Sequence, residues 1–497
     1  MLKRIRVSLA VVCFVAITLL FLDFTGALQA YFGWLAKVQL LPAVLAGNFV
    51  IVALLLVLTL LFGRWYCSVV CPMGVMQDVF FVMGRGLRKK KKLGTAEGSK
   101  AKQWLRVAVL VVFVVLMAAG LNWVALLIAP YSAYGRIASS MLQPVYLWVN
   151  NLLAGVAEHY GSYAFYGVDV WLKSGLTLAV AAVTLVVIGF LSFRGGRTWC
   201  NTICPVGTVL GFVSKYALFK PVIDESKCMS CGKCAKGCKA SCINAKEKEI
   251  DYTRCVGCMD CIGECKQGAV QYKFVGFGKK SEAAVDGSRR TFLATTAAVA
   301  ATSAVMAQEK EIDGGLAVIE DKQVPARKTP IKPFGSTSNK SFGNHCTSCQ
   351  LCVSACPNGV LRPSRELSSL MQPEMSYERG YCRPECTRCA EVCPTGAIKK
   401  ITAAEKTNYK VGLAIFVEQN CVVNRDGVNC GNCARHCPAG AINMVPKNPG
   451  EDPELALTLK IPTVDESRCI GCGACENLCP ARPFSAIYVE GREDHLV

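Results

Sequence analysis

Cysteines in regular groups are the residues of this chain best suited to chemistry. The sequence has 30 cysteines among 497 residues, far above ordinary usage. Such a content is typical of disulfides in secreted proteins, of zinc sites or of iron–sulfur clusters. Most of the cysteines stand in runs of four spaced C-x2-C-x2-C-x3-C or nearly so. Because zinc sites need two cysteine pairs rather than repeated runs of four, this spacing favours [4Fe–4S] clusters.

The first cysteine block, residues 220–275, contains this run twice and resembles a bacterial two-cluster ferredoxin. In such ferredoxins, each run gives three ligands to one cluster and its fourth cysteine to the other. The resemblance therefore implies one cluster on Cys228, Cys231, Cys234 and Cys265, and a second on Cys255, Cys258, Cys261 and Cys238. Two lysines, Lys239 and Lys266, stand where proline usually follows the fourth cysteine. Cys242 is a spare thiol that could compete as a ligand.

The second cysteine block, residues 343–497, has four groups, each ending in Cys-Pro. The groups are Cys346, Cys349, Cys352 and Cys356; Cys382, Cys386, Cys389 and Cys393; Cys421, Cys430, Cys433 and Cys437; and Cys469, Cys472, Cys475 and Cys479. Sixteen cysteines in groups of four predict four clusters, and hence about six in the whole chain. The wider gaps in the second and third groups predict longer loops over those clusters.

Two further pairs, Cys67 with Cys71 and Cys200 with Cys204, belong to an internal repeat with the pattern C-x3-C-P. Cysteines four residues apart share one face of a helix. Two such pairs at one membrane face could form a redox or metal site, or they could be separate structural thiols. The spacing alone leaves both interpretations open.

The elements expected to position these cysteines begin with a membrane domain, residues 1–205. Four apolar runs near residues 7–24, 41–62, 104–129 and 175–193 approach or exceed the length needed to cross a membrane. The net charge of +19 comes largely from short basic runs beside them, which indicates positive-inside topology and not nucleic-acid binding. Tyr131, Tyr134 and Trp171, on the opposite side, suit a membrane interface. The four histidines lie outside the apolar runs, so no haem is expected.

A twin-arginine export signal is predicted between the two cysteine blocks, at residues 288–307. Arg289 and Arg290 precede Phe-Leu and a soft apolar run, which is the pattern of such signals. This segment is either cleaved after Ala307 or retained as a fifth span. Residues 308–342, rich in Lys, Pro, Gly and Ser, are expected to form a linker. Export of a folded, cluster-bearing domain would place the first block in the cytoplasm and the second outside it.

The chain resembles two known proteins in series. Residues 1–275 resemble NapH, with four spans, two C-x3-C-P motifs and a cytoplasmic two-cluster domain. Residues 288–497 resemble NapG, its exported four-cluster partner in periplasmic nitrate reduction. MauN, MauM and the membrane half of NosR share these patterns. The expected fold is thus a membrane α-helical bundle of four spans, with a fifth if the signal is retained, joined to α+β ferredoxin domains in the inner membrane.

Four-cluster ferredoxin subunits of this kind imply nested ligand sets, in which the outer groups exchange their fourth cysteines and so do the inner groups. The outer clusters would then use Cys346, Cys349, Cys352 with Cys479, and Cys469, Cys472, Cys475 with Cys356. The inner clusters would use Cys382, Cys386, Cys389 with Cys437, and Cys421, Cys430, Cys433 with Cys393.

The resemblance implies a quinol dehydrogenase that passes electrons from the membrane quinol pool to a periplasmic reductase or its cytochrome partner. It also implies contact with lipid and with the twin-arginine export machinery. Two alternatives remain open. The first block could accept electrons from a cytoplasmic ferredoxin or flavoprotein, or the protein could be an assembly factor for a periplasmic redox enzyme. The sequence identifies no quinone-binding residue.

Overall fold

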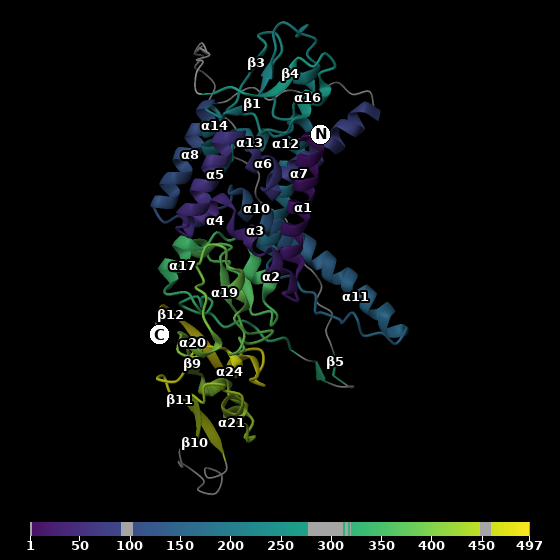
Figure 1. Ribbon diagram of the computed structural model, residues 1–497. Coiled ribbons are helices and arrows are strands. Elements are labelled where there is room, and N and C mark those ends of the chain that lie inside the picture. Colours follow the sequence, from purple (N-terminus) through teal and green to yellow (C-terminus); the bar gives the residue numbers. More distant parts are fainter. Residues whose placement is uncertain are drawn as a thin grey trace, which may run out of the picture.

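The computed structural model describes residues 2–90, 103–276, 312–313, 317–318, 320–447 and 459–496. Three parts follow one another along its long axis (Figure 1). The first cysteine block lies at one end, a helical part lies in the middle, and the second cysteine block lies at the other end. The predicted export signal, including Arg289 and Arg290, lies outside the described residues.

The helical part is built from an internal repeat. Its elements are α1 Leu2–Leu22, α2 Ala27–Phe32, α3 Trp34–Lys37, α4 Leu40–Leu45, α5 Phe49–Phe62, α6 Trp65–Val69, α7 Pro72–Lys90, α8 Gln103–Ala118, α9 Asn122–Ala125, α10 Pro130–Ile137, the π-helix η1 Ala138–Leu142, α11 Gln143–His159, α12 Gly175–Gly195, α13 Thr198–Thr202 and α14 Pro205–Ser214. In both α5–α7 and α12–α14, a long apolar helix ends at glycine, a five-residue helix carries the first cysteine, and proline starts the next helix. This arrangement confirms the repeat inferred from the C-x3-C-P motifs.

Two helices of the described chain, α1 and α12, are long and apolar enough to cross a membrane. The apolar helices α5 and α8 are shorter, at 14 and 16 residues. The second expected span is broken between α4 and α5, where Asn48 caps α5 by accepting a hydrogen bond from the Ile51 amide at 3.2 Å. The third is interrupted between α8 and α9. The four-span bundle therefore stays a prediction.

The first cysteine block is a small α+β unit. Its elements are β1 Phe219–Ile223, α15 Lys233–Lys236, β2 Ile243–Asn244, β3 Glu249–Ile250, α16 Asp260–Glu264 and β4 Val270–Phe274. The outer strands β1 and β4 pair antiparallel, and the hairpin β2–β3 joins the two cysteine runs. This block contacts the helical part through backbone hydrogen bonds, such as that from the Arg197 amide to the Lys239 carbonyl at 2.7 Å.

The second block repeats this plan. Its elements are α17 Asn339–His345, α18 Leu351–Ala355, β7 Leu361–Pro363, the 3-10 helix η2 Leu367–Ser369, β8 Pro373–Met375, α19 Arg388–Val392, α20 Ala403–Lys406, β9 Lys410–Phe416, the 3-10 helix η3 Glu418–Asn420, α21 Val422–Arg425, α22 Asn432–Arg435, β10 Ile442–Pro446, β11 Lys460–Val464, α24 Ala474–Asn477 and β12 Ile487–Leu496. The hairpin β7–β8 joins the first two cysteine groups, and β10–β11 joins the last two. Strands β9 and β12 pair antiparallel around the last two groups. A short pair, β5 Ile312–Asp313 with β6 Ala317–Val318, precedes the block.

The later half of the segment that was expected to be a linker belongs to the second block. Lys322 donates hydrogen bonds to the carbonyls of Glu476 and Asn477, both at 2.7 Å. Phe334 is buried, and α17 begins within the predicted linker. The composition indicates a solvated connector. The linker prediction is nevertheless wrong for residues 320–342, because Lys322 binds carbonyl groups of the second block.

The helical part packs directly on the second block. A Cβ added to Gly135 of α10 would lie 2.1 Å from the Cys349 carbonyl oxygen, so only glycine permits this approach. Asn122 donates to the Gly343 carbonyl at 3.1 Å beside it. Tyr131 and Tyr134, expected as membrane-interface anchors, are 2% and 1% exposed. That expectation is therefore corrected: both rings are buried and pack against Phe21 of α1.

Candidate functional site

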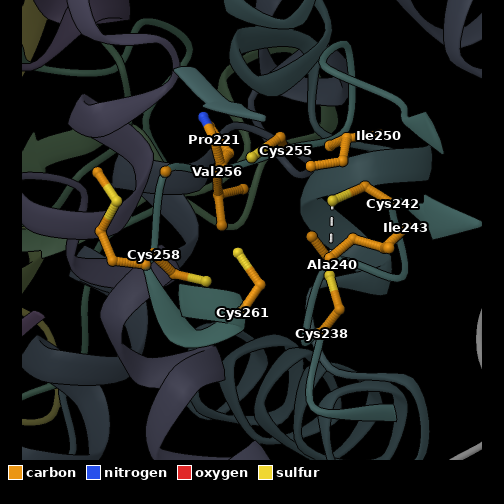
Figure 2. A pocket seen from close by; sticks show the side chains of 12 residues that line it. Pro221, Cys238, Ala240, Cys242, Ile243, Ile250, Cys255, Val256, Cys258 and Cys261 are labelled. Atoms are coloured by element: carbon orange, nitrogen blue, oxygen red, sulfur yellow. Dashed lines mark hydrogen bonds between the residues drawn. The ribbon is translucent and has the colours of Figure 1, made fainter. Parts of the chain in front are cut away.

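The cysteines of the first block form two sets of four, each lining one cavity. Site A consists of Cys228, Cys231, Cys234 and Cys265. Site B consists of Cys255, Cys258, Cys261 and Cys238 and is shown in Figure 2. In both sites, three thiols come from one run and the fourth from the other run. The structure thus groups the cysteines as the two-cluster resemblance implied.

Cys242 is a fifth thiol at site B. Its sulfur lies 3.5 Å from that of Cys238, as the dashed line in Figure 2 marks. Hydrogen bonding from Cys242 lowers the pKa of Cys238 to about 6 and also lowers the pKa of Cys255. The spare cysteine therefore contacts the ligand set and can stabilise charge on two of its sulfurs.

The last two groups of the second block exchange their fourth cysteines with each other. Site E consists of Cys469, Cys472, Cys475 and Cys437, which line one cavity. Site F consists of Cys421, Cys430, Cys433 and Cys479, which line another. This grouping contradicts the nested sets, which assigned Cys479 to the first group and Cys437 to the second.

The first two groups exchange in the same way. Site C consists of Cys346, Cys349, Cys352 and Cys393, because Cys393 acts electrostatically on all three of the others. Site D consists of Cys382, Cys386, Cys389 and Cys356, because Cys356 acts on Cys382 and Cys389. The nested assignments of Cys356 and Cys393 are therefore also wrong.

The strand pairing explains this correction. Strands β9 and β12 flank groups three and four and pair with each other, as β1 and β4 do around the first block. Each of these two closed units brings together only the two groups inside it. In all three units a β-hairpin joins one cysteine group to the next, so the fourth cysteine of one group lies beside the next group in sequence. The chain is thus three successive two-site units.

Sites C to F form a row that leads away from the helical part. Site C lies against α10, and Cys352 of site C interacts electrostatically with Cys389 of site D. The Cys382 amide of site D donates to the Cys472 carbonyl of site E at 3.0 Å. Sites E and F share one unit at the far end, where α21 and β10 lie in Figure 1.

Tyr377 holds the two units of the row together. It is fully buried, and its hydroxyl donates to the Gly471 carbonyl at 2.6 Å. Gly473 has a φ of +79°, and a Cβ there would lie 2.2 Å from the tyrosine ring. Only glycine fits this position, so the ring can lie between sites D and E.

The surroundings of these sites fit negatively charged, thiolate-bound clusters. Backbone amides donate to sulfurs at 3.3–3.4 Å, including those of Cys346, Cys437 and Cys479. The buried Lys406 places its ammonium 3.2 Å from the Cys382 sulfur. Hydrogen bonds and charges of this kind tune cluster potentials. Within the described residues, no three His, Cys, Asp or Glu side chains form a site for a single metal ion.

The two C-x3-C-P motifs meet in a buried cysteine tetrad, defined as Cys67, Cys71, Cys200 and Cys204, each 3–4% exposed. Arg64 donates to the Cys200 carbonyl at 3.2 Å, and Arg197 donates to the Cys67 carbonyl at 2.6 Å. Each repeat thus reaches the first cysteine of the other. Gln77 adds a hydrogen bond to the Cys200 sulfur at 3.1 Å. The structure therefore answers whether the pairs meet, which their spacing left open.

Buried charges connect the tetrad to site B. Arg197 also donates to Asp78 at 2.6 Å, and Lys239, which follows the site B ligand Cys238, donates to Asp78 at 2.8 Å. Burial alone would raise the pKa of Asp78, but the charges of Arg197 and Lys239 hold it well below its usual range. Arg64 reaches the first block too, through the Thr253 carbonyl at 3.2 Å.

Sequence reasoning missed these polar residues at the tetrad. Arg64 and Arg197 are basic residues at the ends of apolar runs, where a topology signal is expected, yet they are 0% and 1% exposed. Their equivalent positions, three residues before the first cysteine of each motif, were a signal in the repeat. Gln77 and Asp78 carry no comparable sequence signal.

Comparison with known families agrees with this reading of the cysteines. Residues 45–91 and 175–223, which contain the two C-x3-C-P motifs, match a family described as "4Fe-4S binding domain". Residues 345–397 and 428–482 match the "4Fe-4S dicluster domain" family. These two matches contain most of the second block's cysteines. No solved structure is similar to the chain at a significant level.

Three related proteins show which family the chain belongs to. The methylamine utilization ferredoxin-type protein MauM of Methylobacillus flagellatus is 33% identical over 169 residues, which are 33% of this chain and 70% of that protein. The ferredoxin-type protein NapG of Escherichia coli is 31% identical over 187 residues, or 33% of this chain and 75% of NapG. The putative electron transport protein YccM of Escherichia coli is 27% identical over 205 residues, covering 40% of this chain and 47% of YccM. The chain therefore belongs to the NapG- and MauM-type ferredoxin family and is an iron–sulfur electron-transfer protein.

Proposed function

We propose that this protein is a membrane-bound quinol dehydrogenase that passes electrons from the quinol pool through [4Fe–4S] clusters to a periplasmic reductase or its cytochrome partner. The row of cysteine sites C to F carries this proposal, because it starts at the helical part and ends at the far tip of the molecule. In this scheme the clusters supply one-electron redox chemistry, and the chain positions them and tunes their potentials.

Membrane insertion is supported by apolar side chains that point outward from the helical part. Val12 of α1 is 63% exposed, Phe49 of α5 is 81% exposed, and Val186 of α12 is 68% exposed. Large apolar surfaces of this kind mark contact with a membrane or a partner. A bilayer around these helices would separate the first cysteine block from the second, in agreement with export of the second block alone.

The six sites A to F are proposed to hold six [4Fe–4S] clusters, and the tetrad is proposed to be a further redox or metal centre. Two buried arginines, Arg64 and Arg197, lie beside the four thiols, and their positive charges favour a thiolate at Cys200. Burial, with the neighbouring cysteines adding to it, raises the pKa of Cys71 and Cys204, so thiolates there depend on a bound metal or on the arginines.

The contact between site B and the tetrad favours a second point at which electrons could enter the protein. Arg64 lies beside both Cys67 of the tetrad and Cys255 of site B. A cytoplasmic ferredoxin or flavoprotein could therefore donate electrons at sites A and B. Nothing specific in the structure favours the assembly-factor alternative.

Reduction of the purified full-length protein by donors of each class tests the proposal. When decylubiquinol or a menaquinol analogue is mixed with the protein, the visible absorbance of the oxidised clusters is expected to fall as they are reduced. Reduced ferredoxin serves as the competing donor. If ferredoxin reduces the clusters and no quinol does, the quinol dehydrogenase proposal fails. Electron donation by a cytoplasmic ferredoxin or flavoprotein at sites A and B then replaces it.

A further inference from the structure

The largest cavity described here lies between the helical part and the second block. Its volume is about 650 Å³, within the range typical of sites for small organic ligands. Gln143 and Lys173 line its inner wall, beside Cys356, which is a site D cysteine. Trp171 and Arg379 line its outer wall. The cavity therefore brings a small-molecule site to the edge of the cluster row.

Two polar groups at the inner wall, the buried Gln143 and the partly buried Lys173, are held in place by hydrogen bonds. Gln143 is 2% exposed and donates to the Ser354 carbonyl at 3.0 Å. Lys173 donates to the Gln143 side-chain oxygen at 2.8 Å and to the Val353 carbonyl at 3.1 Å. An ammonium has three N–H groups, and within the part of the chain that the structure describes only these two oxygens accept from that of Lys173. The third N–H group can donate to an oxygen atom of a ligand in the cavity.

The inner wall also adjoins two cluster sites at once. Ser354 and Val353 belong to α18, which carries Cys352 of site C and ends just before Cys356 of site D. A ligand held by Gln143 and Lys173 would therefore lie beside the first two sites of the row.

The outer wall combines a flat aromatic surface with an exposed carboxylate. The Arg379 guanidinium lies 4.9 Å from the Trp171 ring centroid and donates to Asp169 at 2.6 Å. Asp169 lines the cavity, and its side chain is 76% exposed. A planar ring could pack against this wall, and the carboxylate could pass protons to water.

Helix α11 has one face on the cavity and an exposed apolar face on its other side. Leu147 of α11 lines the cavity, and the same helix projects from the body of the molecule in Figure 1. Its outward side chains include Val145, Trp148 and Leu152, which are 61%, 63% and 57% exposed. A helix with such a face can lie in the membrane surface. A ligand with a polar ring in the cavity and an apolar tail that passes around α11 would use both faces of this helix.

Resting on the proposed function, we propose that this cavity binds the quinol head group, and that electrons enter the row at sites C and D. One quinol loses two electrons, one at a time, to oxidised clusters at these sites and becomes quinone. Its two protons leave through Asp169 to water outside the membrane. Gln143 and Lys173 hold the ring oxygen nearest the clusters, and the isoprenoid tail follows α11.

Photolabelling of the purified full-length protein with an azido-quinone locates the site without relying on turnover. Labels are expected on residues 166–173 or 379–383. Lys173→Met and Gln143→Leu should each weaken labelling about tenfold, the factor expected for one charge-assisted or buried hydrogen bond. The matched control is Lys460→Met, at an exposed lysine of β11 that adjoins no cysteine in the sequence. Iron content and reduction by dithionite should be unchanged, which shows that the variants fold and load their clusters.

The outcomes separate this proposal from the proposed function. If quinol reduces the clusters but the label falls on other helices, or if Lys173→Met labels like the unaltered protein, the cavity assignment is wrong and the quinol dehydrogenase function stands. If quinol neither reduces the clusters nor protects any residue from label, both are wrong. Labelling of the cavity that Lys173→Met and Gln143→Leu both weaken supports the assignment.

Discussion

Asp78 is predicted to fasten the first cysteine block to the helical part. Its carboxylate accepts hydrogen bonds from Arg197 at 2.6 Å, Lys239 at 2.8 Å and Arg6 at 3.3 Å. The side chains of these cations are only 0–6% exposed, and that of Asp78 is 13% exposed. Asp78→Asn keeps the shape of the side chain but leaves three buried cations without their carboxylate.

The expected loss of stability follows from this burial. Removing one partner of a buried ion pair costs about 3–5 kcal/mol, because the remaining charges are left uncompensated. For a unit of roughly 150–250 residues, this corresponds to a melting temperature lower by roughly 10 °C. Differential scanning fluorimetry of the detergent-solubilised protein measures the shift. Glu225→Gln, at an exposed carboxylate, is the matched control and should leave the melting temperature unchanged.

The pH dependence gives a second check. Because the folded pKa of Asp78 is depressed below its unfolded value of about 3.9, its stabilising contribution is present above that pH and is lost as the pH falls through the folded pKa. The difference between the unaltered protein and Asp78→Asn should therefore be constant from about pH 5 to 8 and shrink only in stronger acid. A melting temperature within about 2 °C of the unaltered protein, at about pH 7, would refute the reasoning.

Two other predictions concern the second block. Cys479→Ser should remove the site F cluster alone, so that iron falls from about 24 to about 20 atoms per chain, while quinol still reduces sites C to E; a loss of site C by electron paramagnetic resonance would instead restore the nested assignment. Replacing Arg289 and Arg290 by lysine should keep the second block in the cytoplasm, as judged by protease protection in spheroplasts, and continued export would contradict the signal.

Much of the site was predictable from cysteine spacing. The runs at Cys228 and Cys255 predicted sites A and B, including the exchange of fourth cysteines, because a tight loop and a following helix fix these positions locally. The spacing does not say which of four groups pair. That choice depends on β9 and β12, whose residues are separated by two cysteine groups in the sequence.

The helical part was less predictable. Hydropathy detects an apolar run but not the break at residues 46–48 that shortens α5. The positive-inside rule assigns arginines to one side of the membrane and does not predict their contacts. Arg64 and Arg197 are buried by contacts with residues more than a hundred positions away in the sequence. Long-range hydrogen bonds of this kind appear only when the two halves of the repeat are brought together.

The unbranched sequence of sites C to F has a consequence for the timing of turnover. With all four sites filled, the row can store four electrons, which is the yield of two quinols. A quinol, which has two electrons to lose, can then be oxidised completely while the acceptor withdraws electrons singly and at its own pace. The second block would thus store electrons between two reactions of different stoichiometry. If no acceptor were bound at the tip, electron transfer out of the protein would stop, but a quinol already bound could still be oxidised completely.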